Sequence, residues 1–220
     1  HISAIGATLG AELPWLVSTL DSEGTVGQYP SLAFGPDGLP AISYYASSPS
    51  NDLRFVRFDG TAWNYSIVDS AGFVGEYTSL AFGPDGQPAI SYYAGTPNND
   101  LKFARFDGNT WTLATVHSIG DVGWHTSLAF GPDGRPAIAY YNTTLDDLVF
   151  AHFDGNAWTN TTVDSAGDVG KYASLAFGTD GQPAIAYFDG SPNLDVKFAR
   201  FDGSVWTNTT VEDGVNLGLY

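Results

Sequence analysis

One fifteen-residue phrase occurs four times in this chain and limits how it can fold. SLAFGPDGLPAISYY begins at Ser31, and close copies begin at Ser79, Ser127 and Ser174. In each copy a short apolar run meets a turn in which Asp caps its own backbone and the last Gly accepts a positive φ. The run after the turn opens with Pro, which is tolerated at the first position of a strand. The phrase therefore predicts a hairpin, used four times.

Tryptophan marks the period of the repeat. Trp15, Trp63, Trp111, Trp158 and Trp206 are separated by 48, 48, 47 and 48 residues. Repeats of this length made only of strand-like segments are typical of propellers and other radial β arrays. Each repeat is expected to hold four strands: the Trp strand, as in Trp63 to Asp69, the two hairpin strands, and a strand such as Asp100 to Gly108. We therefore expect an all-β chain.

The order of the strands follows from the lengths of the connections. The link from the Trp strand to the next hairpin is long, as in Asp69 to Tyr77, and its two glycines suit a crossing between neighbouring sheets. This places SLAF innermost in each sheet, PAISYY second, the Asp100 strand third and the Trp strand outermost. We predict a single β-propeller domain, 1–220, in which residues 15–206 form four four-stranded blades.

The two ends of the chain depart from the repeat. Residues 207–220 repeat the sequence pattern of the outer strand and the crossing loop, after which another SLAF run would be expected. Residues 1–14 match no full hairpin, although His1 to Gly6 is similar to the start of an inner strand. Two alternatives follow. The ends form a reduced fifth blade within one chain, or an end strand pairs with another copy.

Charge and composition exclude several classes of partner. The chain has 24 acidic and 8 basic residues, a net charge of −16. Such a surface repels phosphate backbones and anionic lipids, which argues against binding nucleic acid or a membrane surface. No apolar run of about 18 residues is present, so membrane insertion is not expected. There is no cysteine, and disulfides and thiolate metal sites are therefore excluded.

The repeat resembles a known type. The pattern D-S-x-G-x-V-G-x-Y-x-S-L-A-F, continued by D-L-K-F-A and D-G-x-x-W, is similar to tandem repeats of secreted and surface proteins of bacteria and archaea. These repeats are taken to be β-propeller blades, and the resemblance covers about residues 15–220. It implies an extracellular or cell-surface location and a binding or structural role. It brings no catalytic motif.

Aspartate recurs at fixed places in the repeats. Asp21, Asp69 and Asp164 end Trp strands and are candidate Ca²⁺ ligands, since Ca²⁺ takes carboxylate and turn carbonyl oxygens. No D-x-[DN]-x-[DN]-G loop is present, and turn formation explains the same residues. Glutamates are few and the aspartates are copied around the repeats, whereas a glycosidase needs a distinct carboxylate pair. No enzymatic activity is expected.

Aromatic residues precede each SLAF run: Tyr29, Tyr77, His125 and Tyr172, with Trp124 beside His125. If SLAF is innermost, these rings lie where the loop enters the centre, and aromatic faces there can stack on a sugar. The alternative is that they fill the gap between blades. The third repeat is the outlier, because it also carries His117, Val149 and His152. We interpret its three histidines as drift rather than as a transition-metal site.

Four sites match the N-x-[ST] glycosylation signal: Asn64, Asn142, Asn160 and Asn208. Three of them lie just after the repeat Trp, on the strand placed at the rim. A glycan there would face solvent and cover an exposed edge. Chance and the β propensity of Thr explain the pattern equally well.

These patterns favour a non-enzymatic extracellular structural protein. We expect it to self-associate, as the subunit of a surface filament that grows by β-strand exchange or head-to-tail propeller contacts. The alternative is a lectin or adhesin that binds glycans. A glycosidase-like enzyme ranks third.

Overall fold

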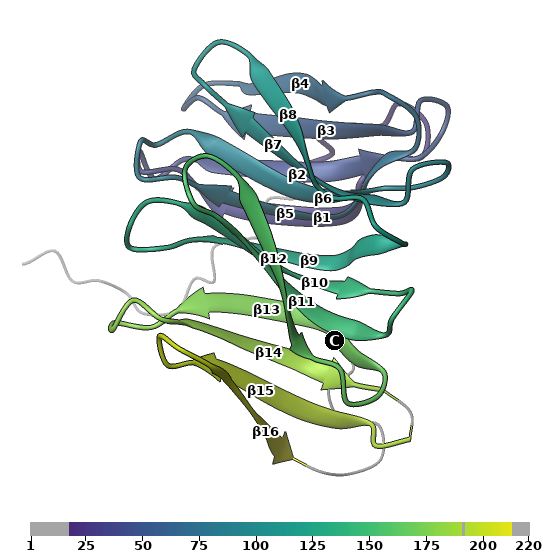
Figure 1. Ribbon diagram of the computed structural model, residues 1–220. Helices are drawn as coiled ribbons and strands as arrows, with labels where there is room; N and C mark the ends of the chain where they lie inside the picture. The colour runs from purple at the N-terminus through teal and green to yellow at the C-terminus, as the bar shows by residue number, and fades with distance from the viewer. Residues whose placement is uncertain (1–17, 191, 213–220) are drawn as a thin grey trace, which may run out of the picture.

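The computed structural model describes residues 18–190 and 192–212, which fold into four four-stranded antiparallel sheets (Figure 1). We call these sheets blades 1 to 4. Blade 1 holds β1 (Gln28–Phe34), β2 (Pro40–Ala46), β3 (Asp52–Phe58) and β4 (Trp63–Asp69). Blade 2 holds β5 (Val74–Phe82), β6 (Pro88–Ala94), β7 (Asp100–Phe106) and β8 (Trp111–His117). Blade 3 holds β9 (Val122–Phe130), β10 (Pro136–Asn142), β11 (Asp147–Phe153) and β12 (Trp158–Asp164). Blade 4 holds β13 (Val169–Phe177), β14 (Pro183–Asp189), β15 (Asp195–Phe201) and β16 (Trp206–Glu212).

The repeated hairpin forms as the sequence predicts. In blade 1 the Leu39 amide donates to Asp37 Oδ1 at 3.0 Å, and Gly38 has a φ of 75°. Pro40 then pairs with Phe34 across the turn. The local chemistry of the turn therefore fixes the register of the two inner strands.

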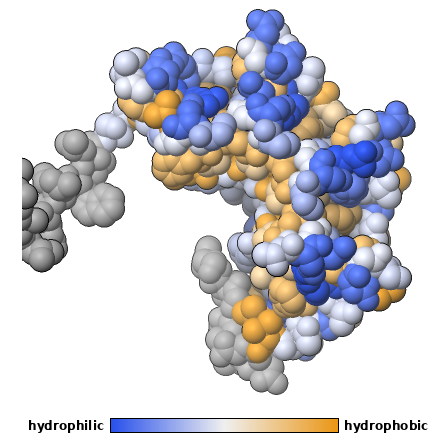
Figure 2. Space-filling view, turned by 90° about the vertical axis from the view of Figure 1, so that its left-hand side faces the viewer, coloured by the Kyte–Doolittle hydropathy of each residue, from blue (hydrophilic) through white to orange (hydrophobic). Residues whose placement is uncertain are grey.

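The strand order within each blade also agrees with the prediction. Strands pair in chain order in every blade, so that the SLAF strand and the Trp strand form the two edges. The SLAF strands of neighbouring blades pack together in the order β1, β5, β9, β13. Figure 2 shows the blades following an arc around a hollow. The all-β class and the tandem blade repeat are confirmed.

The crossing segment is shorter than the sequence analysis predicted. It was expected to run from Asp69 to Tyr77, but β5 already begins at Val74, whose amide donates to Asn51 O at 3.1 Å. The pairing of β5 with β6 shifts register twice before Ser79, and Tyr77 has a φ of 52°. The segment around Tyr77 is thus a bulged continuation of the inner strand rather than a loop.

Three apolar clusters fill the spaces between neighbouring blades. Leu53 and Phe55 of blade 1 pack against Leu80, Ile90 and Tyr92 of blade 2, and the other two clusters repeat this arrangement. A Trp from the following blade contacts a Phe of the preceding blade edge-on, with ring centroids 5.2 Å apart, in Trp111–Phe55, Trp158–Phe103 and Trp206–Phe150. Each such buried side chain contributes about 1.5–3 kcal/mol. Side-chain packing therefore joins the blades.

Some predictions fall outside the described residues. These are the roles of residues 1–14 and the continuation of the partial repeat over 213–220. Within the described ranges, no helix is long and apolar enough to cross a membrane.

Candidate functional site

Of the three aspartates proposed as calcium ligands, Asp69 and Asp164 join neighbouring blades, and Asp21 joins the segment before blade 1 to blade 1. Asp69 Oδ2 accepts from Tyr92 Oη at 2.7 Å and contacts Lys102 Nζ, both on the following blade. Burial by itself would raise the pKa of Asp69, but the hydrogen bonds from Lys102 and Tyr92 outweigh it and lower the pKa. The same contacts link Asp21 to Tyr44 and Arg54, and Asp164 to Tyr187 and Lys197. These carboxylates already have cationic partners, which Ca²⁺ would have to displace.

No group of three or more His, Cys, Asp or Glu side chains in residues 18–190 and 192–212 is arranged to hold a metal ion. The three histidines of the unusual repeat lie on different strands: His117 on β8, His125 on β9 and His152 on β11. Each therefore has its own surroundings.

In the third repeat, both partners of the ion pair that joins neighbouring blades are replaced. His117 stands where Asp69 and Asp164 stand, and Val149 replaces the lysine that would pair with that carboxylate. His117 Nδ1 lies 2.7 Å from Tyr140 Oη, so a neutral hydrogen bond replaces the ion pair. Burial lowers the pKa of His117, which favours the neutral ring.

The predicted aromatic residues meet in a continuous row along the inner strands. Ring centroids are 4.6 Å apart for Tyr29–Tyr77, 4.7 Å for Tyr77–His125 and 4.4 Å for His125–Tyr172. Each of the four has a φ between 49° and 54°, because each sits at the bulge of its strand. Trp124 stacks on Tyr77 with centroids 5.1 Å apart. We call these five residues the aromatic row.

The rings of the aromatic row contact one another, and Tyr29 and Tyr172 at its two ends keep 40% and 37% of their surface exposed. The hollow beside them measures about 240 Å³, and small residues of the same strands complete its lining: Pro30, Thr78, Thr126 and Ala173. Burial and the nearby Lys171 lower the pKa of His125 to about 4. The row thus offers ring edges and a neutral imidazole. Ligand binding here stays a prediction.

The glycosylation candidates differ in exposure. Asn142 is buried, with 3% of its surface exposed, and its Oδ1 accepts from the Thr144 amide. Asn160 and Asn208 donate to carbonyl oxygens of the preceding blade, at Val116 and Val163. Asn64 is exposed, and its side chain donates to Asp59 Oδ2 of the neighbouring turn at 2.9 Å. Their modification stays a prediction, and Asn64 is the residue that leaves most room for it.

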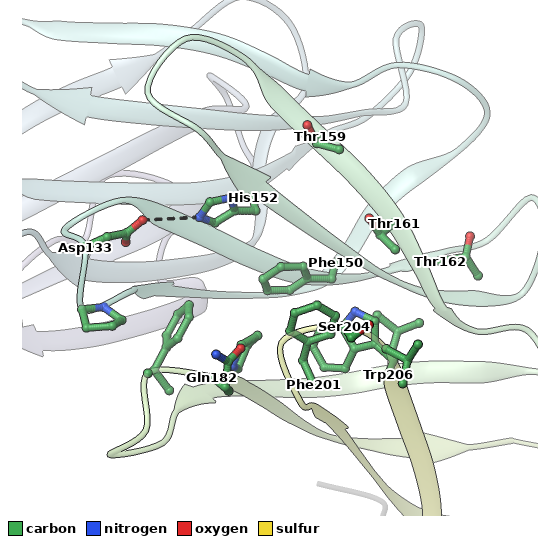
Figure 3. Close-up of a pocket in the computed structure, with 16 residues that line it drawn as sticks. Asp133, Phe150, His152, Thr159, Thr161, Thr162, Gln182, Phe201, Ser204 and Trp206 are labelled. Carbon is green, nitrogen blue, oxygen red and sulfur yellow. Dashed lines mark ion pairs between the residues drawn. The ribbon is translucent and has the colours of Figure 1, made fainter.

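A groove of about 860 Å³ lies between blades 3 and 4 (Figure 3). We call it groove 3/4. Its apolar walls come from Phe150, Phe177, Phe201 and Trp206, and its polar groups from Asp133, His152, Thr159, Thr161, Gln182 and Ser204. Figure 3 shows Asp133 and His152 together at one end, with Thr162 and Trp206 towards the other. Groove 3/4 thus combines aromatic surface with hydrogen-bonding groups.

Groove 3/4 coincides with a break in the repeat. In the other blades an arginine at the end of the third strand binds the aspartate of the first turn, as Arg57 Nη2 binds Asp37 Oδ2 at 2.7 Å. Blade 3 has His152 at this position, and its Nε2 lies 3.9 Å from Asp133 Oδ2. The side chains of His152 and Asp133 keep 36% and 45% of their surface exposed. Both therefore have hydrogen-bonding capacity left for a ligand.

The groove between blades 2 and 3 shows what the usual arginine does. It measures about 360 Å³, and Arg105 lines it. The guanidinium carbon of Arg105 lies 5.0 Å from the ring centroid of Phe130 and covers that ring. In groove 3/4 the shorter His152 takes this place, and Phe177 lines the open space. Groove 3/4, which is lined by His152 in place of the arginine, is the larger of the two.

His152 was interpreted from the sequence as drift, and groove 3/4 was not predicted. A signal was present, because His152 replaces the third-strand arginine that binds the counterparts of Asp133. In the structure Arg135 Nε of the same turn also lies 3.9 Å from Asp133 Oδ2. The sequence cannot show that this aspartate and His152 face the Trp and Phe of two different blades.

Comparison with known proteins finds solved structures with a similar fold but assigns the chain to no family. No protein-family model matches the chain, and no curated protein is similar to it in sequence. The fungal lectin of Aleuria aurantia, a six-bladed β-propeller with a described mode of fucose recognition, is 19% identical with a TM-score of 0.57, over 84% of this chain and 61% of that one. The SapL1 lectin in complex with α-methyl fucoside is 16% identical with a TM-score of 0.59, over 87% and 65%.

An enzyme is also among the similar structures. An ulvan lyase of polysaccharide lyase family PL25 is 14% identical with a TM-score of 0.60, over 81% of this chain and 56% of that one. The chain thus spans 56–65% of the length of these three structures. At these identities the comparisons establish a propeller-type blade repeat.

Proposed function

We propose that the protein binds carbohydrate, and that groove 3/4 is the binding site. The observation that carries this proposal is the loosened Asp133–His152 pair, which faces the aromatic walls formed by Phe150 and Trp206. A sugar ring has an apolar face that packs on aromatic rings and hydroxyl groups that need hydrogen-bond partners. A carboxylate, an imidazole and threonine hydroxyls provide such partners along one groove.

The similar solved structures support this class of ligand. Two of them are lectins described with fucose or a fucoside, and the third is a polysaccharide lyase. Propeller-type repeats of this kind are thus used on glycans by other proteins. Carbohydrate binding, the second hypothesis of the sequence analysis, is therefore our preferred function.

The charge of the chain narrows the class of glycan. A net charge of −16 repels sulfated, sialylated and uronic saccharides at low ionic strength. Asp133 adds a negative charge within the groove itself. We expect a neutral saccharide as the ligand.

We propose binding without catalysis. Asp133 is the single acidic residue among the described residues that line groove 3/4, whereas most glycoside hydrolases place two carboxylates across the bond they cleave. Extracellular or cell-surface location, which the resemblance of the repeat implies, is part of the same proposal.

The test is a glycan array of neutral, sulfated and sialylated saccharides, followed by titration calorimetry with the strongest neutral binder. The variant is His152→Arg, which restores the residue of the other three repeats. We expect its guanidinium to pair with Asp133, cover Phe177 and weaken binding at least tenfold, or about 1.4 kcal/mol. Because the other blades tolerate arginine here, we expect the variant to fold normally.

Tyr77→Ala, in the aromatic row, is the matched control and should keep the wild-type affinity. Loss of binding in Tyr77→Ala but not in His152→Arg would move the site to the aromatic row. Absence of any bound saccharide on the array would contradict the proposed function. Self-association, the first hypothesis of the sequence analysis, involves different residues.

A further inference from the structure

The blade contacts follow one rule along the chain. At each of the three internal junctions, a Trp of the following blade packs edge-on against a third-strand Phe of the preceding blade, with 5.2 Å between ring centroids. A valine near the end of the preceding outer strand is buried beside them: Val68, Val116 and Val163 each expose 7% of their surface. By this pattern, the third-strand Phe and the outer-strand Val of blade 4 are the residues that would contact a following blade.

Those residues of blade 4 are open. Phe198 is 37% exposed, whereas its counterparts Phe55 and Phe103 are 6% and 8% exposed. Val211, the counterpart of the buried valines, is 65% exposed. Blade 4 therefore presents an apolar face on which Phe198 and Val211 are exposed, at the positions whose counterparts pack at the junctions inside the chain.

At the other end of the arc, residues just before blade 1 show which segment fits such a face. Asp21 Oδ2 accepts from Tyr44 Oη at 2.7 Å and from Arg54 Nη1 at 2.8 Å, the contacts that Asp69 makes with blade 2. Tyr65 Oη donates to Leu20 O at 2.5 Å, just as the Asn208 side chain donates to Val163 O. Leu20 and Asp21 thus occupy the place of the outer-strand end of a blade that precedes blade 1.

The repeat then assigns a role to Trp15. It stands 48 residues before Trp63, and Asp21 follows it at the same interval at which Asp69 follows Trp63. Trp15 is therefore the tryptophan of that preceding blade. By the rule of the internal junctions, its partner is a third-strand Phe with an open face, and Phe198 has one.

We propose that the open face of blade 4 binds the N-terminal segment of a second copy of this chain, with Trp15 of that copy packed against Phe198. Leu20 and Asp21 are held on blade 1, at the opposite end of the arc from blade 4 (Figures 1 and 2). Trp15 is six residues from Asp21 and therefore stays within about 20 Å of the blade 1 end of the arc. The segment of a second copy is free of this tether. The contact joins two different surfaces, so each copy keeps one open end and the assembly extends head to tail.

The absence of cysteine makes cross-linking a clean test. Leu16→Cys, next to Trp15, and Thr209→Cys, on the exposed residue that pairs with Phe198 across β15 and β16, leave both rings in place. The two single variants are prepared separately, mixed, and treated with a short bismaleimide at micromolar concentration. We expect a covalent dimer in the mixture, several-fold above either variant alone. Val205→Cys is the matched control, because Val205 is 57% exposed on blade 4 but lines groove 3/4 on the opposite face. Mixed with Leu16→Cys, it should give no excess dimer.

The double variant Leu16→Cys/Thr209→Cys distinguishes the two possible origins of the segment. A ladder of covalent oligomers supports pairing between copies. A cross-linked monomer without a ladder would assign the face to the chain's own N-terminal segment and overturn the proposal. The proposal also fails if neither sample cross-links although mass spectrometry shows both cysteines modified by the reagent. Glycan binding in groove 3/4 is independent of either outcome.

Discussion

His125 is the member of the aromatic row whose charge changes within an accessible pH range. In the unfolded chain its pKa is near 6.5, whereas burial and Lys171 lower the pKa to about 4 in the folded protein. Between these values the unfolded chain binds the proton more readily, so stability falls as the pH drops through this window. At about 1.4 kcal/mol per pKa unit, and allowing for partial exposure of the ring, we expect a loss on the order of 2 kcal/mol.

The variant His125→Tyr, which restores the tyrosine of the other repeats, should lack this part of the acid destabilisation. Urea unfolding at pH 7 and pH 4.5 measures the difference, and the histidine titration followed by NMR gives the midpoint directly. A midpoint near 6.5 in the folded protein would contradict the burial of this ring against its neighbours.

For single residues, the sequence predicted which side chains are candidates for a site better than it predicted which residues they contact. The four residues Tyr29, Tyr77, His125 and Tyr172 were identified from their spacing, because the repeat places them at one position of one strand. Asp69 was a candidate metal ligand because a carboxylate at a turn is all that the sequence shows. Its bonds to Tyr92 and Lys102 depend on how one blade packs on the next, which no local pattern encodes.

Serine hydroxyls connect the inner strands of neighbouring blades. Ser79 Oγ accepts from the Leu128 amide of the next blade at 2.9 Å, and Ser31 and Ser127 make the same contact with Leu80 and Leu175. Ser79→Ala leaves the amide of a buried residue without its partner, so we expect a loss of about 1–2 kcal/mol. Ser174 holds the same position in blade 4, where no described blade follows, and Ser174→Ala should change stability by less than about 0.5 kcal/mol.

Denaturant unfolding of both variants at low micromolar concentration, where head-to-tail contacts are few, is the measurement. Equal losses for Ser79→Ala and Ser174→Ala would mean that the hydroxyl stabilises its own strand rather than the junction between blades.

The elements themselves were largely predictable, for local reasons. Each hairpin turn carries its own chemistry in Asp37 and Gly38 or their counterparts, and the outer strand from Trp63 to Asp69 ends as predicted. The predicted start of β5 was wrong, because the bulged segment before Ser79 pairs with β6 and brings the Tyr77 ring against Tyr29 and His125 of the neighbouring blades. Those contacts exist only once three blades stand side by side.

At the scale of the whole molecule, the net charge opposes the head-to-tail assembly proposed for the open face of blade 4. Each copy carries a net charge of −16, so two copies repel one another before Trp15 and Phe198 come into contact. Salt shortens the range of this repulsion, from about 10 Å at 0.1 M to about 3 Å at 1 M, and leaves apolar burial intact. We therefore expect head-to-tail association to strengthen when NaCl is raised from about 0.05 to about 0.5 M, as seen by light scattering or sedimentation velocity. Phe198→Asp removes the ring and adds a charge, and should stay monomeric at both salt concentrations. Association that weakens as salt rises would point to ion pairs rather than to the apolar face of blade 4 as the source of the contact.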